Sequence, residues 1–92
     1  IKREAKKIQR EYNETLDYVE IVKITQFTWK KIDDFRAKNK INITPKENDA
    51  LQKRLIGRGI ASIPESRYLY TFVARVDENG FDLAENGIRI KP

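Results

Sequence analysis

The chain contains no cysteine, histidine or methionine, and only two serines among its 92 residues. Without cysteine and histidine it can form no disulfide or thiolate–imidazole metal site, and it has no thiol nucleophile or imidazole base. Carboxylate, lysine and tyrosine chemistry remains, but no pair of these groups stands in a recognisable catalytic arrangement. The carboxylates of "KIDDF" and "RVDENG" lack the spacing of a calcium loop. We therefore expect a protein that is not an enzyme, with no catalytic residue, metal or cofactor.

Long hydrophobic runs are also missing. No run of 18 apolar residues is present, so no transmembrane helix and no membrane contact are expected. The start "IKREAKKIQR" lacks the apolar centre of a signal peptide, and the absence of cysteine favours a reducing compartment, so we expect a cytoplasmic protein. The length fits one domain over residues 1–92, and the missing initiator methionine predicts a fragment of a longer protein.

The net charge of +5 is distributed unevenly along the chain. Residues 21–60 carry ten basic and four acidic side chains, which indicates a polyanionic partner. The candidate nucleic-acid-binding residues are Lys30, Lys31, Arg36, Lys38, Lys40, Lys53, Arg54 and Arg58. If the chain binds DNA, these residues would together form one positive surface that makes nonspecific phosphate contacts. The spacing of Lys30, Asp34 and Lys38 at steps of four favours a solvated face, because charges at that spacing form intrahelical pairs.

Apolar spacing predicts two helices in the first forty residues. Five apolar residues at steps of four and three predict a helix from about residue 2 to residue 23, with a weak point near Ile24. These five are Ile8, Tyr12, Leu16, Val19 and Val22. A second helix is expected to start after an N-cap at Thr28 and to bury a stripe at steps of three. The stripe is Trp29, Ile32 and Phe35.

The run "TPKENDALQKRLIGRG" predicts a third helix with both ends defined. Thr44 is the expected N-cap, and Glu47 three residues later completes a capping box. Pro45 fixes the first helical φ in advance. Gly57 or Gly59 ends the helix, because glycine accepts the left-handed conformation needed there.

The charged residues of the third helix allow two interpretations. Asp49 can pair with Lys53 one turn later. Arg54 and Arg58 lie one turn apart at the C-terminal end, where cations compensate the negative end of the helix dipole. The other role open to these two arginines is phosphate contact.

Residues 68–76 alternate as a strand does and also step as a helix does. A second capping box, from Ser62 to Glu65, and a glycine at position 80 favour a helix over residues 63–78. In the tail, "FDLAENGIRIKP", the second of two "ENG" turn signals predicts an extended segment or a short hairpin.

The predicted fold is therefore all-α, a small bundle of about four helices with an extended or hairpin tail. The apolar positions on the helix faces predict the core. Its expected members are Ile8, Tyr12, Leu16, Val19, Trp29, Ile32, Phe35, Leu51, Leu55, Leu69, Phe72, Val73 and Val76.

A pattern of caps and core residues covers residues 28–82. It consists of "TWKKIDDFRAKNKINITPKENDAL", then "GRGIASIPES", then a helix closed by "ENGFD". This pattern resembles the C-terminal helical tail of bacterial abortive-infection phage-resistance (AIPR-type) proteins. The resemblance implies a C-terminal accessory module of a prokaryotic antiviral defence protein, and no catalytic residue is carried over. Its residues are Trp29, Ile32, Asp33, Thr44, Pro45, Pro64, Gly80 and Phe81.

Two functions remain open. The first is a non-catalytic interaction or scaffold module, whose partners are other domains of its parent protein or a separate protein. The second is a DNA-binding domain in which residues 29–40 and 44–57 form a helix-turn-helix pair and the tail hairpin forms a wing. Near the start of the second helix of that pair, Lys46, Asn48 and Gln52 are the residues suited to base edges.

Overall fold

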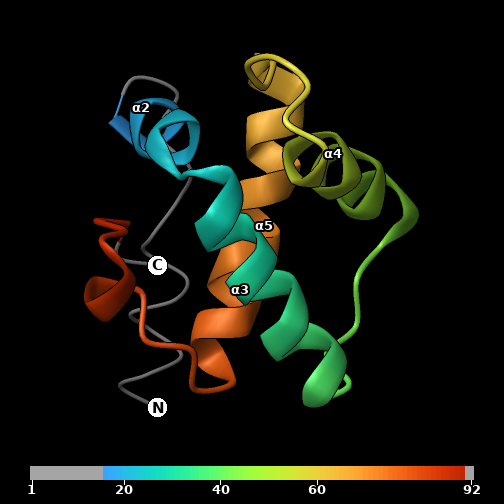
Figure 1. Cartoon of the computed structure of the whole chain (residues 1–92), viewed down its shortest axis with the longest axis vertical. Coiled ribbons are helices and arrows are strands. Elements are labelled where there is room, and N and C mark those ends of the chain that lie inside the picture. Colours follow the sequence, from blue (N-terminus) through green and yellow to red (C-terminus); the bar gives the residue numbers. More distant parts are fainter. Residues whose placement is uncertain (1–15, 91–92) are drawn as a thin grey trace, which may run out of the picture.

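The computed structural model describes residues 16–90, which form four α-helices (Figure 1). These are α2 (Leu16–Lys23), α3 (Gln26–Lys38), α4 (Pro45–Leu55) and α5 (Ile63–Glu78), followed by the 3-10 turn η1 (Ala84–Asn86). The predicted all-α bundle of four helices is confirmed. Residues 16–90 contain no strand, so the hairpin alternative for the tail is wrong. No helix in this range is long and apolar enough to cross a membrane.

The longest helix, α5, forms the centre of the fold. The helices α2, α3 and α4 each lie against it, and α3 also contacts α4 (Figure 1). Four apolar residues of α5 at steps of three, one and three are fully buried: Leu69, Phe72, Val73 and Val76. Burial of each such side chain contributes about 1.5–3 kcal/mol, so this face of α5 contributes substantially to stability.

Most of the predicted core is confirmed. Trp29, Ile32 and Leu51 are buried along with the face of α5, and Phe35 and Leu55 are partly buried against them. The sequence pattern missed a further set of buried apolar residues, which come mainly from loops and the tail. They are Ile21, Ile41, Ala50, Ala61, Tyr70, Phe81, Leu83, Ile88 and Ile90.

Both predicted capping boxes are present. Thr44 Oγ1 accepts from Glu47 N (3.2 Å) while Glu47 Oε1 accepts from Thr44 N (3.0 Å). Ser62 and Glu65 form the same pair of hydrogen bonds at the start of α5 (3.3 and 3.0 Å). Each box satisfies two backbone donors that a helix N-terminus otherwise leaves unpaired, which explains why both helices begin where the sequence predicts.

The predicted glycine ends are also present. Gly57 has φ +69°, and the next residue, Arg58, donates its N–H to the carbonyl of Lys53 (2.9 Å). This is a Schellman ending, in which the left-handed residue turns the chain back over the last helical carbonyls. Gly80, with φ +106°, ends α5 in the same way.

The predicted N-cap of α3 at Thr28 is wrong. The cap is Thr25, whose Oγ1 accepts from the backbone N–H of Thr28 (3.2 Å), and the helix begins at Gln26. Threonine is a favourable N-cap at either position, and the helix begins after Thr25, which lies next to the end of α2 at Lys23. The predicted weak point near Ile24 is confirmed, because residues 24 and 25 are not helical.

The predicted inward face of the first helix is wrong at Leu16 and Val19, whereas Val22 is half-buried. Leu16 and Val19 are 67% and 44% exposed, whereas Ile21 is 1% exposed. In the observed orientation of the helix, Ile21 packs in the core and Tyr18 donates a hydrogen bond to the carbonyl of Ala61 (2.9 Å). The predictions for Ile8 and Tyr12, and for the start of this helix near residue 2, lie outside the described residues.

A buried ion pair joins α4 to α5. Glu47 is 3% exposed, and its Oε1 and Oε2 accept from Arg75 Nη1 (2.6 Å) and Nη2 (3.0 Å). Burial raises the pKa of Glu47, but the hydrogen bonds from Arg75 and from the backbone of Thr44 outweigh it and hold that pKa below its ordinary value. The capping carboxylate of α4 is therefore also its link to the central helix.

Candidate interaction surface

The side chain of Arg54 is buried and makes hydrogen bonds within the fold. Its side chain is 8% exposed, and its Nη1 and Nη2 donate to the carbonyls of Gly59 (3.2 Å) and Arg58 (3.1 Å). The guanidinium thereby holds the loop that follows α4 against the end of that helix. Nε is buried and finds no acceptor among the described residues. Arg54 is thus removed from the exposed basic surface expected from the sequence.

Three of the other candidate cations are paired with carboxylates. Lys30 lies 3.6 Å from Asp34, and Arg36 donates to Asp33 through Nε and Nη2 (3.1 and 3.0 Å). The pairing expected between Lys53 and Asp49 is wrong, because Lys53 Nζ lies 2.7 Å from Oε2 of Glu65 on α5.

The pair between Lys53 and Glu65 lies in a positive environment. The hydrogen bond from Lys53 holds the pKa of Glu65 below its ordinary value, and the positive charge of Arg54 adds to this effect. The C-terminal end of α4 and the loop after it therefore form a positive region, and the last turn of α4 is its natural place because the helix dipole is negative there.

The remaining candidate cations do not form one surface. Lys31 Nζ lies 3.5 Å from Asn86 Oδ1 and 5.0 Å from the centroid of the Phe27 ring. Lys38 and Lys40 are exposed at the C-terminal end of α3, whereas Arg58 is exposed in the α4–α5 loop. These two sites are at opposite ends of the molecule in Figure 1, where α3 ends at the bottom and the α4–α5 loop is at the top.

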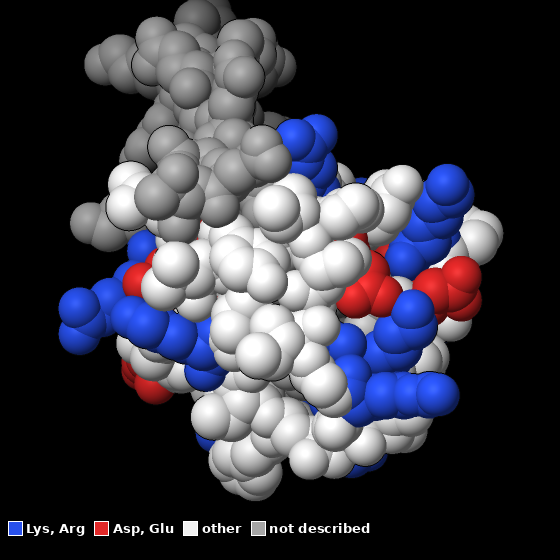
Figure 2. Space-filling model, turned by 90° about the horizontal axis from the view of Figure 1, so that it is seen from above, with Lys and Arg blue, Asp and Glu red and all other residues white. Residues whose placement is uncertain are grey.

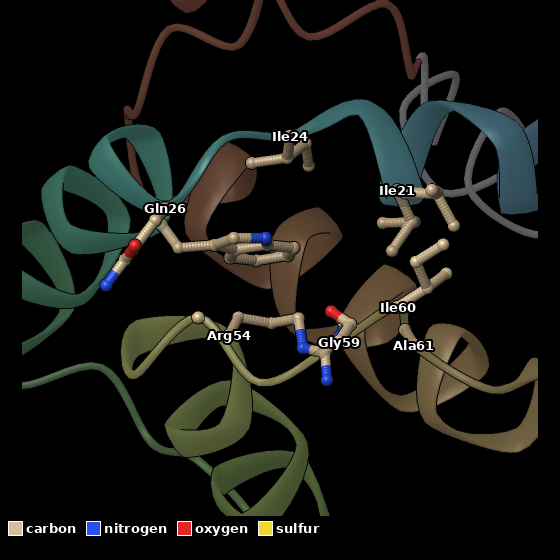
Figure 3. A pocket seen from close by; sticks show the side chains of 10 residues that line it. Ile21, Ile24, Gln26, Arg54, Gly59, Ile60 and Ala61 are labelled. Carbon is tan, nitrogen blue, oxygen red and sulfur yellow. Dashed lines mark hydrogen bonds between the residues drawn. The ribbon is translucent and has the colours of Figure 1, made fainter.

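A pocket of about 130 Å³ lies between the α2–α3 junction and the α4–α5 loop. In Figure 3, Ile21 and Ile60 lie at one end of this pocket, Gln26 lies at the other end, and Arg54 runs along its floor. Its residues come from three elements that are distant in sequence. They are Ile21, Val22, Ile24, Gln26, Trp29, Arg54, Gly57, Gly59, Ile60 and Ala61.

Two hydrogen bonds fix the shape of the pocket. The hydrogen bond from Tyr18 to the carbonyl of Ala61 holds α2 against the α4–α5 loop. Gln26, the first residue of α3, donates from Nε2 to the carbonyl of Leu55 at the end of α4 (2.6 Å). Gly59, with φ +68°, makes the second tight turn of the loop wall. One of these groups, Gln26, itself lines the pocket, so the lining is polar as well as apolar.

Three exposed isoleucines lie in or beside the α4–α5 loop, and one of them, Ile60, lines the pocket. Ile56, Ile60 and Ile63 are 65%, 73% and 46% exposed and stand within eight residues of one another. We call these three side chains and the pocket opening the apolar mouth. Figure 2 looks down on this end of the molecule and shows uncharged side chains across its centre, with Lys, Arg and fewer acidic residues on its flanks.

No spacing in the sequence predicted the apolar mouth. The signal was the run "LIGRGIASI", in which isoleucines stand outside any helical stripe and two glycines turn the chain. Isoleucine in such a loop is either core or contact surface, and spacing alone does not distinguish the two. The structure makes the distinction by burying Ala61 and exposing Ile60.

The chain matches no protein-family model, no curated protein and no solved structure. Within residues 16–90, no group of three or more acidic, histidine or cysteine side chains is placed to hold a metal ion.

Proposed function

We propose that this chain is a non-catalytic interaction module that binds protein through the apolar mouth. The observation that carries the proposal is the exposure of Ile56, Ile60 and Ile63 in and beside the α4–α5 loop, where Ile60 also lines a pocket. Scattered exposed apolar side chains are ordinary, but a cluster that borders a pocket is typical of a protein contact. The partner is another domain of the parent protein or a separate protein.

The resemblance to the helical tail of AIPR-type proteins supports the proposal that this chain is an accessory module of a larger protein. A C-terminal accessory module needs no chemistry of its own, and this chain lacks cysteine and histidine, two side chains that are common in active sites. In such a setting the apolar mouth would join the module to the rest of a phage-defence protein or to its target.

DNA binding through the helix-turn-helix pair is the alternative function, and the contacts of the cations weigh against it. Lys46 Nζ lies over the ring of Tyr68 (5.8 Å from its centroid), and Gln52 Nε2 donates to Asn48 Oδ1 (3.2 Å). The residues suited to read bases are therefore engaged within the molecule. Residues 16–90 also contain no strand from which a wing could form.

Capture experiments from nuclease-treated bacterial extract test the proposal with three baits. These are the unaltered chain, Ile60→Glu, and the double variant Lys38→Glu with Lys40→Glu. We expect the same protein partner on the unaltered chain and on the lysine double variant, and its loss from Ile60→Glu. A partner that the lysine double variant loses and Ile60→Glu keeps would contradict the proposal and favour the basic surface.

A further inference from the structure

The outer side of α2 carries exposed apolar side chains, Leu16 and Val19. The opposite side of the helix holds Ile21, which packs in the core, and Tyr18, which donates to the carbonyl of Ala61. Among the described helices α2 packs mainly on α5, and it lies at the edge of the bundle (Figure 1). The fold therefore determines which side of this helix faces outward.

The apolar stripe predicted for the first helix lies on this outer side. Counted backward from Val19, the residues Leu16, Tyr12, Ile8 and Ala5 stand at steps of three, four, four and three. Such steps place residues on one face of an α-helix, so the predicted helix would continue the side of α2 that Leu16 and Val19 occupy. Tyr12, Ile8 and Ala5 lie outside the described residues, and their place on this face follows from the spacing. An apolar helix face that points away from its own domain is typical of a contact with another molecule.

The charge along this segment is ordered so that it complements itself. Residues 1–10 carry five basic side chains and one acidic one, and residues 11–20 carry four acidic side chains and no basic one. A second copy in the opposite direction places the basic stretch of each chain against the acidic stretch of the other. A second copy in the same direction would place like charges against each other at both ends. The order of charges therefore favours an antiparallel second copy.

Two of the four acidic residues are engaged within the fold. Asp17 is buried, and Glu20 is half-buried with its carboxylate 3.7 Å from Nζ of Lys23. The electrostatic part of the contact thus depends mainly on Glu11 and Glu14, which stand upstream of α2 in the sequence.

The antiparallel arrangement also suits the sizes of the side chains. When residues 1–10 of one copy face residues 11–20 of the other, Glu11 is level with Arg10 of the second copy and Glu14 is level with its Lys7. In the same register Leu16 is level with Ala5 of the second copy, so a large side chain meets a small one. Alternation of large and small residues allows two helices to approach closely.

We propose that a second copy of this chain binds the outer side of α2, with the first helices of the two copies antiparallel. The apolar stripe supplies the affinity, and the order of charges sets the direction. Each copy gives and receives the same contact, so the pair closes as a dimer. The contact uses none of the isoleucines of the apolar mouth, so it goes beyond the proposed function and does not depend on it.

Sedimentation equilibrium of the full chain measures the self-association. We expect a monomer–dimer equilibrium with a Kd of about 100 µM or tighter, which is within the range of small, transient interfaces. Leu16→Glu should raise this Kd about tenfold or more, because it places a charge in the apolar stripe. Ile56→Glu is the matched control, since Ile56 is as exposed as Leu16 (65% and 67%) but belongs to the mouth. It should change the Kd less than about twofold.

A spin label determines the direction of the two helices. The chain has no cysteine, so Lys2→Cys carries a single label. In the antiparallel register residue 2 is level with residue 19 of the second copy, and at 1.5 Å per residue the two labels lie about 25 Å or more apart. In a parallel pair they would lie within about 15 Å of each other. Added salt should raise the Kd of the antiparallel dimer, because it screens the attraction between unlike charges.

Three results would overturn the proposal. The first is a Kd weaker than about 100 µM, which is expected if residues 1–15 instead cover this side of α2 within one chain. The second is a dimer that Ile56→Glu weakens as much as Leu16→Glu does, and the third is a label distance of about 15 Å or less. An unchanged amide spectrum of α3, α4 and α5 in Leu16→Glu confirms that its loss of self-association is local. The partner-capture experiments with Ile60→Glu remain a separate test of the proposed function.

Discussion

Replacement of Glu47 by alanine separates the two tasks of that side chain, which caps α4 and holds Arg75. Loss of the cap exposes one backbone donor and costs about 1 kcal/mol. Loss of the ion pair leaves a guanidinium of which only 28% is exposed, with the carbonyl of Asn42 as its remaining described acceptor. Removal of one partner of a fully buried pair costs about 3–5 kcal/mol, so about 2 kcal/mol is appropriate for a pair with partial access to water.

The expected cost of Glu47→Ala is thus about 3 kcal/mol, a large part of the roughly 5–10 kcal/mol that stabilises a domain of this size. Glu65→Ala is the matched control, because Glu65 also completes a capping box but pairs with Lys53, whose side chain is 51% exposed. Its expected cost is about 1 kcal/mol. Urea denaturation with equal m-values measures both. Costs equal within about 0.5 kcal/mol would refute the role given to the buried pair.

The pH dependence of stability gives a second readout of the same side chain. The pKa of Glu47 is lower in the folded protein than its ordinary value of 4.5, so its contribution is fully present above that value and disappears as the pH falls through the folded pKa. We expect the difference in unfolding free energy between the unaltered chain and Glu47→Ala to shrink as the pH falls below 4.5. A difference that stays constant down to pH 2 would contradict the direction of this pKa.

Three further substitutions test the local structure by urea denaturation. Thr44→Ala should cost about 1 kcal/mol through loss of the cap of α4, and no change would mean that the helix starts elsewhere. Gly57→Ala should cost about 1–2 kcal/mol, because φ is +69° and the new Cβ would lie 3.1 Å from Gln26 Oε1; a neutral result would contradict the left-handed ending. Arg54→Ala should cost about 2 kcal/mol and Arg58→Ala less than about 0.5 kcal/mol, and equal costs would contradict the buried position of Arg54.

The parts of the fold that could be predicted are those determined by residues close to one another in the sequence. The helix over residues 63–78 was predicted at its observed bounds, because Ser62 and Glu65 cap one end and Gly80 closes the other. The capping box of α4 was predicted for the same reason. Hydrogen bonds between residues three apart depend little on the remainder of the chain, so a short stretch of sequence is sufficient to predict them.

The parts that were wrong depend on contacts between distant residues. The observed orientation of α2 includes a hydrogen bond between Tyr18 and Ala61, which are 43 residues apart, and no spacing within α2 reveals it. Likewise Lys53 had two acidic neighbours within reach, and the packing of α4 on α5 selected Glu65. The candidate site shows the same limit, because the pocket joins residues near position 24 to residues near position 60.

The central claim is that the basic residues mainly make contacts within the molecule, and that the chain binds a protein partner through the apolar mouth and does not bind DNA. Fluorescence anisotropy of a labelled random duplex DNA, titrated with the full chain at low and at physiological salt, tests it most directly. The account predicts a Kd weaker than about 100 µM at physiological salt, at the weak end of nonspecific DNA binding. DNA binding with a Kd of about 1 µM or tighter, whose Kd rises steeply with salt and which Lys38→Glu with Lys40→Glu abolishes, would contradict this claim.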